Sequence, residues 1–234
     1  MPLSILYEDN HLIAVEKPCG VPTQADKSGD PDLLNLVKEY IKTRDGKPGN
    51  VYLGMVHRLD RPVSGVVVFA KTSKAAARLS AQIRDGRFRK VYLAIVHGIP
   101  SPPEGTLEHW LVKDNRHNFV STCSPRAPNA KKAVLVYRTL AAYREMSLLA
   151  IDLVTGRPHQ IRVQLAAEGH PVVGDEKYGG KSGAPVSMLA LYAVEVSFEH
   201  PVRGEKLTIH APSPSGEPWE SLLRKRVLPC PLIS

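Results

Sequence analysis

The sequence predicts an α+β fold built on a mixed, mostly antiparallel sheet. The chain has 234 residues, enough for one large domain or two small lobes with a substantial core. Strand-like stretches outnumber helical ones, and they do not alternate with helices as in a βαβ protein. Residues 88–97 alternate with a period of two, which is typical of a strand.

The first elements follow from apolar spacing and turn residues. Residues 3–7 and 12–15 are apolar segments around a polar turn, which predicts a hairpin. A loop rich in proline and glycine follows at 17–29. Asp30-Pro31 then predicts a helix start, because a carboxylate caps the first turn and proline fits its first position. Apolar residues at helical spacing carry this helix to about Thr43.

Two strands and a second helix are predicted next. Residues 51–56 predict a strand, and 65–71 predict a buried strand, because that run is apolar on both faces. Thr72 or Ser73 caps a helix that runs to Asp85. Its apolar stripe is expected to consist of three residues: Ala76, Leu79 and Ile83.

The second half of the chain is predicted to be mainly strand. The expected strands are 106–112, 133–140, 147–154, 188–198 and 206–210, and a terminal helix is expected at 218–227. Three loops are candidates for mobility: 100–105, 124–132 and 179–185.

A further helix is predicted after a strand-to-helix turn at residues 155–165. Pro158 suits its first position and Gly169 its end. His159 and Arg162 are three residues apart, so they share a face. Exposed N–H groups beside arginines at such a turn indicate an anion site.

The charge balance favours a polyanionic partner. The chain has 31 Lys and Arg against 23 Asp and Glu, a formal charge of +8. Such a balance is typical of nucleic-acid binding, although a merely basic protein would show it too. One stretch is especially basic, with a single Asp85 among seven cations: Lys71, Lys74, Arg78, Arg84, Arg87, Arg89 and Lys90.

The cysteines and the hydropathy of the chain argue against a disulfide-stabilised, zinc-binding, membrane-spanning or secreted protein. The three cysteines lie far apart, which argues against a disulfide framework and a zinc site. Reduced thiols fit a cytoplasmic protein. The chain has no run of about 18 apolar residues, so no membrane span is expected. Residues 1–10 lack the layout of a signal peptide.

The most informative motif surrounds Asp60. This carboxylate lies between Arg58 and Arg61 on a turn that contains Pro62, directly before a buried strand. A guanidinium beside a carboxylate favours the ionised form. The motif therefore predicts an oriented, charged carboxylate near whatever the arginines attract.

Four spaced motifs together resemble the RluA-type pseudouridine synthases. They are His57-Arg58-Leu59-Asp60 with Ser64-Gly65, Lys90-Val91-Tyr92-Leu93-Ala94, residues 156–163 (GRPHQIRV), and Gly174-Asp175 with Tyr178-Gly179. The start of the chain, with Lys17-Pro18-Cys19-Gly20, is also similar to that family. The resemblance runs from about residue 3 to residue 210.

The resemblance implies a pseudouridine synthase fold with two sub-lobes, flanking helices and a central cleft. It also implies conversion of uridine in ribosomal or transfer RNA to pseudouridine, without a metal or cofactor. We expect residues 1–234 to form a single catalytic domain without an N-terminal S4 domain, acting as a cytoplasmic monomer with no membrane partner.

The resemblance also implies roles for individual residues. Asp60 would be the catalytic carboxylate, Tyr92 would stack on the uracil with a possible part in proton transfer, and Arg162 would pair with Asp60. Arg58 would fill the gap left by the extruded base. The full set of expected RNA contacts is His57, Arg58, Lys90 and His159, and His57 is also expected to shape the turn.

Three positions depart from the family pattern. Val63 and Pro158 stand where threonine is common, and Gln164 stands where histidine is common. None of the three carries an assigned chemical role. Val63 lacks the hydroxyl of a threonine, so the resemblance does not predict the RNA contacts beside this turn.

Two other functions remain open at this stage. A hydrolase could use Asp60 with His57, but the chain has no GxSxG elbow and Ser64 has no identifiable base. A non-catalytic RNA-binding protein could have the same fold, but a binder has no need for a carboxylate among phosphates.

Overall fold

The computed structural model describes residues 3–46, 48–179 and 188–225. The chain divides into two compact units. The first comprises Met1–Arg89 and Ala193–Pro212, and the second comprises Lys90–Tyr192 and Ser213–Ser234. This division agrees with the predicted two sub-lobes.

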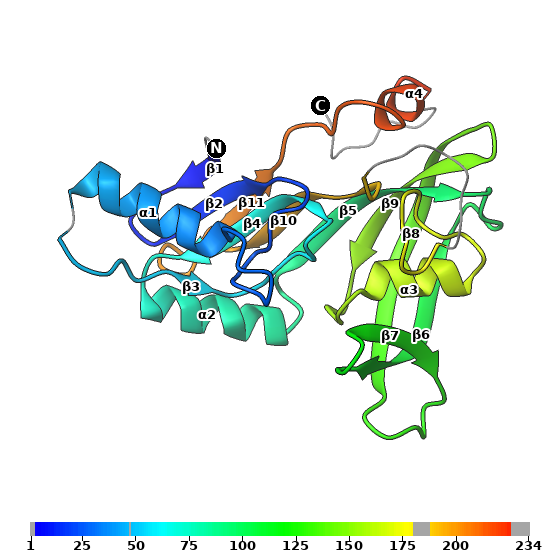
Figure 1. Cartoon of the computed structure of the whole chain (residues 1–234), viewed down its shortest axis with the longest axis horizontal. Helices are drawn as coiled ribbons and strands as arrows, with labels where there is room; N and C mark the ends of the chain where they lie inside the picture. Colours follow the sequence, from blue (N-terminus) through cyan, green and yellow to red (C-terminus); the bar gives the residue numbers. More distant parts are fainter. Residues whose placement is uncertain (1–2, 47, 180–187, 226–234) are drawn as a thin grey trace. The chain divides into compact units, whose positions relative to one another are not determined.

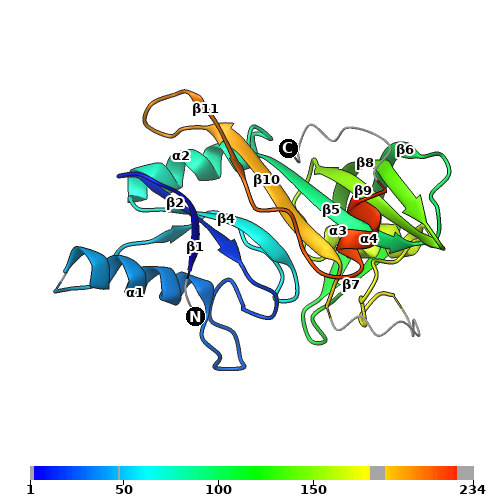
Figure 2. The ribbon, with the colours of Figure 1, turned by 90° about the horizontal axis from the view of Figure 1, so that it is seen from above.

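The first unit is a sheet with two helices (Figure 1). Its strands are β1 (Ser4–Glu8), β2 (Leu12–Lys17), β3 (Gly54–Met55), β4 (Ser64–Ala70), β10 (Leu191–Glu199) and β11 (Lys206–His210). They run in the order β1-β2-β4-β10, with β3 on β4 and β11 on β10. Figure 2 shows β10 and β11 side by side, in an antiparallel pair. The helices are α1 (Leu33–Asp45) and α2 (Ser73–Arg84), and α2 packs against β3 and β4.

The second unit is an antiparallel sheet. Its strands are β5 (Arg89–His97), β6 (Glu104–Asp114), β7 (Phe119–Cys123), β8 (Lys131–Tyr143) and β9 (Met146–Leu153). They run in the order β5-β9-β8-β6-β7, and each neighbouring pair is antiparallel. Helix α3 (Gln160–Ala167) packs against β6 and β7, while α4 (Trp219–Leu223) packs against β8 and β9. The α+β prediction is confirmed.

Each unit has an apolar core drawn from the predicted runs. In the first unit, residues 12–15 of β2 and 66–70 of β4 are fully buried, so β4 is covered on both faces as predicted. In the second unit, residues 93–96 of β5 are fully buried and pair with residues 147–150 of β9. The alternation in 88–97 therefore indicated a strand correctly, but both of its faces are buried.

The start of α1 was predicted two residues too early. The residue that caps this helix is Asp32, whose carboxylate accepts the Asn35 N–H at 3.1 Å. The carboxylate of Asp30 instead pairs with Arg61. Tertiary contact therefore decides which of two nearby carboxylates caps the helix.

The buried stripe of α2 was predicted one residue out of phase. Its buried residues are Ala75, Leu79 and Gln82, while Ala76 and Ile83 are only partly buried. Gln82 is buried because its amide bonds to both backbone groups of Glu199, at 2.7 and 2.9 Å. A polar residue with two backbone partners can replace an apolar one at such a position.

Helix α3 begins later than Pro158 suggested. Its cap is His159, which has left-handed backbone angles (φ 52°, ψ 17°), and its first residue is Gln160. Proline therefore precedes the helix instead of opening it. Ile161 and Leu165 are buried in this helix, and Arg162 is buried as well.

Three further differences concern the extent of elements. The strand predicted at 51–56 is only two residues long, because β3 reaches only the end of β4. Strand β7 was not predicted, since Val120 is its only buried residue. Part of the 179–185 loop and the end of the predicted helix at 218–227 lie outside the described residues.

Candidate active site

The turn around Asp60 connects β3 and β4 in the first unit. The Val63 N–H donates to the Asp60 carbonyl at 3.0 Å, which closes the turn. Just before it, the Thr23 hydroxyl donates to the Leu59 carbonyl at 2.8 Å and accepts the Leu59 N–H at 3.2 Å. Both backbone groups of the residue next to Asp60 are thereby fixed by one buried side chain.

Lys17 holds the other side of this turn. Its side chain is fully buried, and its ammonium donates to the carbonyls of Val21 at 2.6 Å, Arg61 at 2.9 Å and Pro18 at 3.0 Å. Burial lowers the pKa of Lys17 to about 8, against the opposing effects of Cys19 and Asp60. A positive charge therefore lies beneath the carboxylate-bearing turn and joins it to the 18–21 loop.

Arg61 strengthens the same connection. Its carbonyl accepts the Gly20 N–H at 3.0 Å, and its Nε donates to the Gly20 carbonyl at 2.9 Å. Its guanidinium pairs with Asp30 and lies 3.7 Å from Asp26. Of the two arginines that flank Asp60, this one therefore supports the loop that braces the turn.

His57 and Arg58 have different surroundings. His57 Nε2 accepts the Val68 N–H at 2.9 Å, and its ring lies 5.2 Å from that of Phe88. These contacts hold the His57 ring against β4 and Phe88, and its roles in shaping the turn and in contacting RNA stay predictions. Arg58 is exposed, in keeping with a side chain that reaches for RNA.

Arg162 is held in a fixed orientation by neighbouring side chains of the second unit. Its Nε and Nη2 donate to the two carboxylate oxygens of Asp175, each at 2.7 Å, and both side chains are buried. Asp175 also accepts the N–H groups of Lys177 at 3.0 Å and Tyr178 at 3.1 Å. This two-pronged pair fixes the plane of the guanidinium.

Tyr178 forms the second support of Arg162. The guanidinium carbon of Arg162 lies 5.0 Å from the centre of the Tyr178 ring, within the range of a cation–π contact. The Tyr178 hydroxyl accepts the Val120 N–H at 3.0 Å and lies 2.6 Å from His159 Nδ1. One tyrosine therefore links the cap of α3, strand β7 and Arg162.

Tyr92 and Lys90 come from β5. Because they are two residues apart on a strand, they point to the same face. Tyr92 is 6% exposed, and Lys90 is partly buried, with its Nζ against Gly156. Burial lowers the pKa of Lys90.

The loop that carries Gly156 is held by Gln160. The Gln160 Oε1 accepts the Arg157 N–H at 2.9 Å and the Thr155 hydroxyl at 2.8 Å. Its Nε2 donates to the Val134 carbonyl at 3.1 Å. This loop is therefore fixed both to α3 and to β8.

The structure thus groups the predicted residues by unit. The first unit holds Asp60, His57 and Arg58, whereas the second holds Tyr92, Lys90, His159 and Arg162. Residue-level reasoning gave no role to Lys17, Asp175 or Tyr178. The signal was present in the quoted motifs, but the sequence around Asp175 and Tyr178 reads as an ordinary turn.

The basic stretch 71–90 is partly neutralised. Lys71 pairs with Glu8 at 2.6 Å, and Arg87 pairs with Asp85 at 3.1 Å. Lys74 and Arg84 are exposed on α2. Counting charges along the sequence therefore overstated the free positive charge of this stretch.

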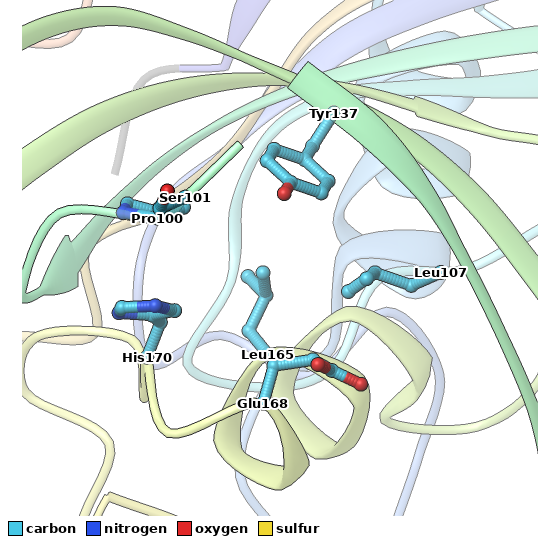
Figure 3. Close-up of a pocket in the computed structure, with 7 residues that line it drawn as sticks. All are labelled: Pro100, Ser101, Leu107, Tyr137, Leu165, Glu168 and His170. Atoms are coloured by element: carbon cyan, nitrogen blue, oxygen red, sulfur yellow. The ribbon is translucent and has the colours of Figure 1, made fainter. Parts of the chain in front are cut away.

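A small hollow lies elsewhere in the second unit (Figure 3). Its volume is about 80 Å³, and it lies between Tyr137 of β8 and Leu165 and Glu168 at the end of α3. Burial, followed by the charge of Glu168, raises the pKa of Tyr137. None of the predicted site residues lines this hollow.

No group of three or more His, Cys, Asp or Glu residues in the described part is placed to hold a metal ion. No helix within the described ranges is long and apolar enough to cross a membrane.

Comparison with known proteins decides the family. The model of the RNA pseudouridylate synthase family matches residues 11–167, which include the Asp60 turn, β5 and the whole of α3. The chain belongs to this family. It is therefore an RNA pseudouridine synthase, an isomerase that acts on RNA.

Relatives of this synthase agree with that assignment. An uncharacterised RNA pseudouridine synthase of Bacillus subtilis, YhcT, is 36% identical over 215 residues, covering 91% of this chain and 69% of the relative. The ribosomal large subunit pseudouridine synthase D of Vibrio cholerae is 36% identical over 235 residues, covering 92% and 68%.

Solved structures show the same fold. The human RNA pseudouridylate synthase domain containing 4 has a TM-score of 0.76 at 24% identity, covering 90% of this chain and 88% of that one. The human RNA pseudouridylate synthase domain containing 1 has a TM-score of 0.73 at 26% identity, covering 91% of this chain and 84% of that one.

Proposed function

We propose that this synthase isomerises specific uridines in ribosomal or transfer RNA, with Asp60 as the catalytic carboxylate. The observation that carries the proposal is the support of the Asp60 turn. Thr23 fixes both backbone groups of Leu59, at 2.8 and 3.2 Å, and Lys17 fixes the carbonyl of Arg61 at 2.9 Å, so the backbone is held on both sides of Asp60. Preorganisation of this kind is what a reacting group needs.

The proposed reaction needs one anionic group at the sugar. The N1–C1′ bond of uridine breaks, the uracil turns, and a C5–C1′ bond forms in its place. The proton on C5 is lost and N1 gains one, so the change is an isomerisation. The Asp60 carboxylate acts at C1′ and is regenerated at the end.

In the proposed reaction, Tyr92 and Arg162 of the second unit assist Asp60. The target base must leave its stack, which costs a few kcal/mol. An aromatic platform such as Tyr92 returns about 1–3 kcal/mol per stacked base. Arg162, held by Asp175 and Tyr178, pairs with Asp60 and keeps its charge oriented.

The remaining predicted residues contact RNA. Arg58 fills the place of the extruded base, while His57, Lys90 and His159 line the path of the strand. We also propose that the protein acts as a monomer in the cytoplasm, without a metal or cofactor. Of the two RNA classes we place ribosomal RNA first, because the Vibrio cholerae relative is named for the large ribosomal subunit.

Mapping pseudouridines in cellular RNA tests this proposal. Ribosomal and transfer RNA are compared from cells with the wild-type protein, without it, and with Asp60→Asn in its place. We expect one or more pseudouridines to vanish without the protein and to stay absent with Asp60→Asn. Full restoration by Asp60→Asn would contradict the catalytic role, and an unchanged map would contradict the choice of RNA.

A further inference from the structure

Lys90 is a partly buried cation for which the described part of the chain provides no counter-charge. No hydrogen bond or ion pair joins its ammonium to any residue in the described part of the chain. Burial alone accounts for its lowered pKa, with no contribution from a carboxylate among the described residues. Buried lysines are normally paired, because removing an ammonium from water is costly.

The position of this ammonium is set by its surroundings. Its Nζ fills the space beside Gly156, where an added Cβ would lie 2.9 Å from it. Gly156 belongs to the loop between β9 and α3, and β9 is the strand that pairs with β5. The bonds of Gln160 hold this loop in place. Lys90 therefore extends along a fixed wall of the second unit.

Lys90 and Tyr92 together match the outline of one nucleotide. Two residues on the same strand face are separated by about 6.6 Å, at a rise of about 3.3 Å per residue. A base and the phosphate of its own nucleotide are separated by a comparable distance. Uracil and ribose are neutral, so the phosphate is the part of RNA that can neutralise an ammonium.

We propose that Lys90 binds the backbone phosphate of the nucleotide whose base rests on Tyr92. This inference builds on the proposed function, since it assigns a partner to one residue of that site. The contact supplies the counter-charge that the protein itself does not provide. Lys90 is then a substrate-binding residue whose charge is retained for RNA at a cost to the stability of the free protein.

Salt dependence of RNA binding tests the phosphate contact. The probe is single-stranded hexauridylate, and its Kd is measured over a series of salt concentrations for wild type, Lys90→Met and Lys90→Arg. Each phosphate contact to a single strand adds about 0.7 to the log–log slope. We expect Lys90→Met to reduce the slope by that amount and Lys90→Arg to retain it. The matched control is Lys42→Met, which removes an exposed lysine of α1 and should leave the slope unchanged.

Two further measurements separate binding from folding. Lys90→Met should raise the melting temperature, because it replaces a partly buried ammonium that lacks a protein counter-charge with an apolar side chain. Gly156→Ala keeps the charge but displaces Nζ, so it should weaken hexauridylate binding several-fold. An unchanged slope in Lys90→Met, or no binding of hexauridylate by wild type, would overturn the inference. Pseudouridine formation by the same wild-type preparation would show that the proposed function stands in either case.

Discussion

Arg162 and Asp175 form a buried, two-pronged ion pair with both N–O distances at 2.7 Å. Asp175 is the residue that makes a buried Arg162 possible, because a lone guanidinium in the interior would be strongly disfavoured. The two residues are 13 positions apart, on α3 and on the turn that ends in Tyr178. The plane of the Arg162 guanidinium is therefore set by Asp175.

Breaking this pair should destabilise the protein. Asp175→Asn would place an amide NH₂ against an arginine donor, and we expect it to lower the free energy of unfolding by about 3–5 kcal/mol. Arg162→Lys should also impair turnover, since an ammonium cannot supply the planar contact. Denaturant unfolding and C5-hydrogen release measure the two effects. Asp85→Asn is the control, because it breaks an exposed pair worth less than about 1 kcal/mol. Wild-type stability in Asp175→Asn would refute this account of the pair.

Tyr178 offers a way to separate its two contacts. Tyr178→Phe keeps the ring beneath Arg162 but removes the hydroxyl that serves Val120 and His159, and should cost about 1–3 kcal/mol of stability. Tyr178→Leu removes the cation–π contact as well. We expect kcat to fall further in the leucine variant than in the phenylalanine variant. Equal kcat values in the two variants would exclude a role for the ring in positioning Arg162.

Lys17 should connect folding to pH. Lys17→Met leaves three carbonyls without their donor, at about 1–3 kcal/mol for each buried group. In wild type the pKa of Lys17 is about 8 when folded and 10.5 ordinarily, so the unfolded chain binds more protons between these values. The contribution of this lysine to stability therefore rises with pH across that interval. Unfolding of wild type and Lys17→Met at about pH 7 and about pH 10 should show the difference growing. A difference independent of pH would be the contrary result.

The exposed cations in and just after α2 should contribute to RNA binding unequally. Lys74 and Arg84 are exposed, whereas Arg87 already pairs with Asp85 and lies 3.7 Å from Glu199. We expect the Lys74→Met and Arg84→Met double variant to lower the salt slope of single-stranded RNA binding by about 1.4, at 0.7 per contact. Arg87→Met should lower it by less. A larger effect of Arg87→Met would contradict the claim that Lys74 and Arg84 are the cations that contact RNA.

The sequence predicted the elements well wherever local signals and packing agree. The buried β4 and the hairpin of β1 and β2 follow directly from their apolar runs. The errors occur where a distant partner decides. The local sequence predicts Asp30 as a helix cap, but in the fold its carboxylate forms an ion pair with Arg61. A glutamine such as Gln82 would be expected at the surface, but its amide donates to the Glu199 carbonyl and the side chain is buried.

The candidate site was predicted in its motifs but not in its supports. Asp60, Tyr92 and Arg162 were identified from the resemblance, and their chemical roles remain predictions. The supports, Lys17 and Asp175, act through partners 44 and 13 residues away, respectively. Spacing within a motif cannot reveal such pairs, because the fold alone brings them together.

The central claim is that Asp60 carries the reaction, and release of hydrogen from C5 of uracil measures it most directly. RNA from cells that lack the protein is labelled at uracil C5 and incubated with wild type, Asp60→Asn and Asp60→Ala. We predict release with wild type and none above background with either variant, while both still bind the RNA. Release by Asp60→Asn at a rate near that of wild type would contradict the claim.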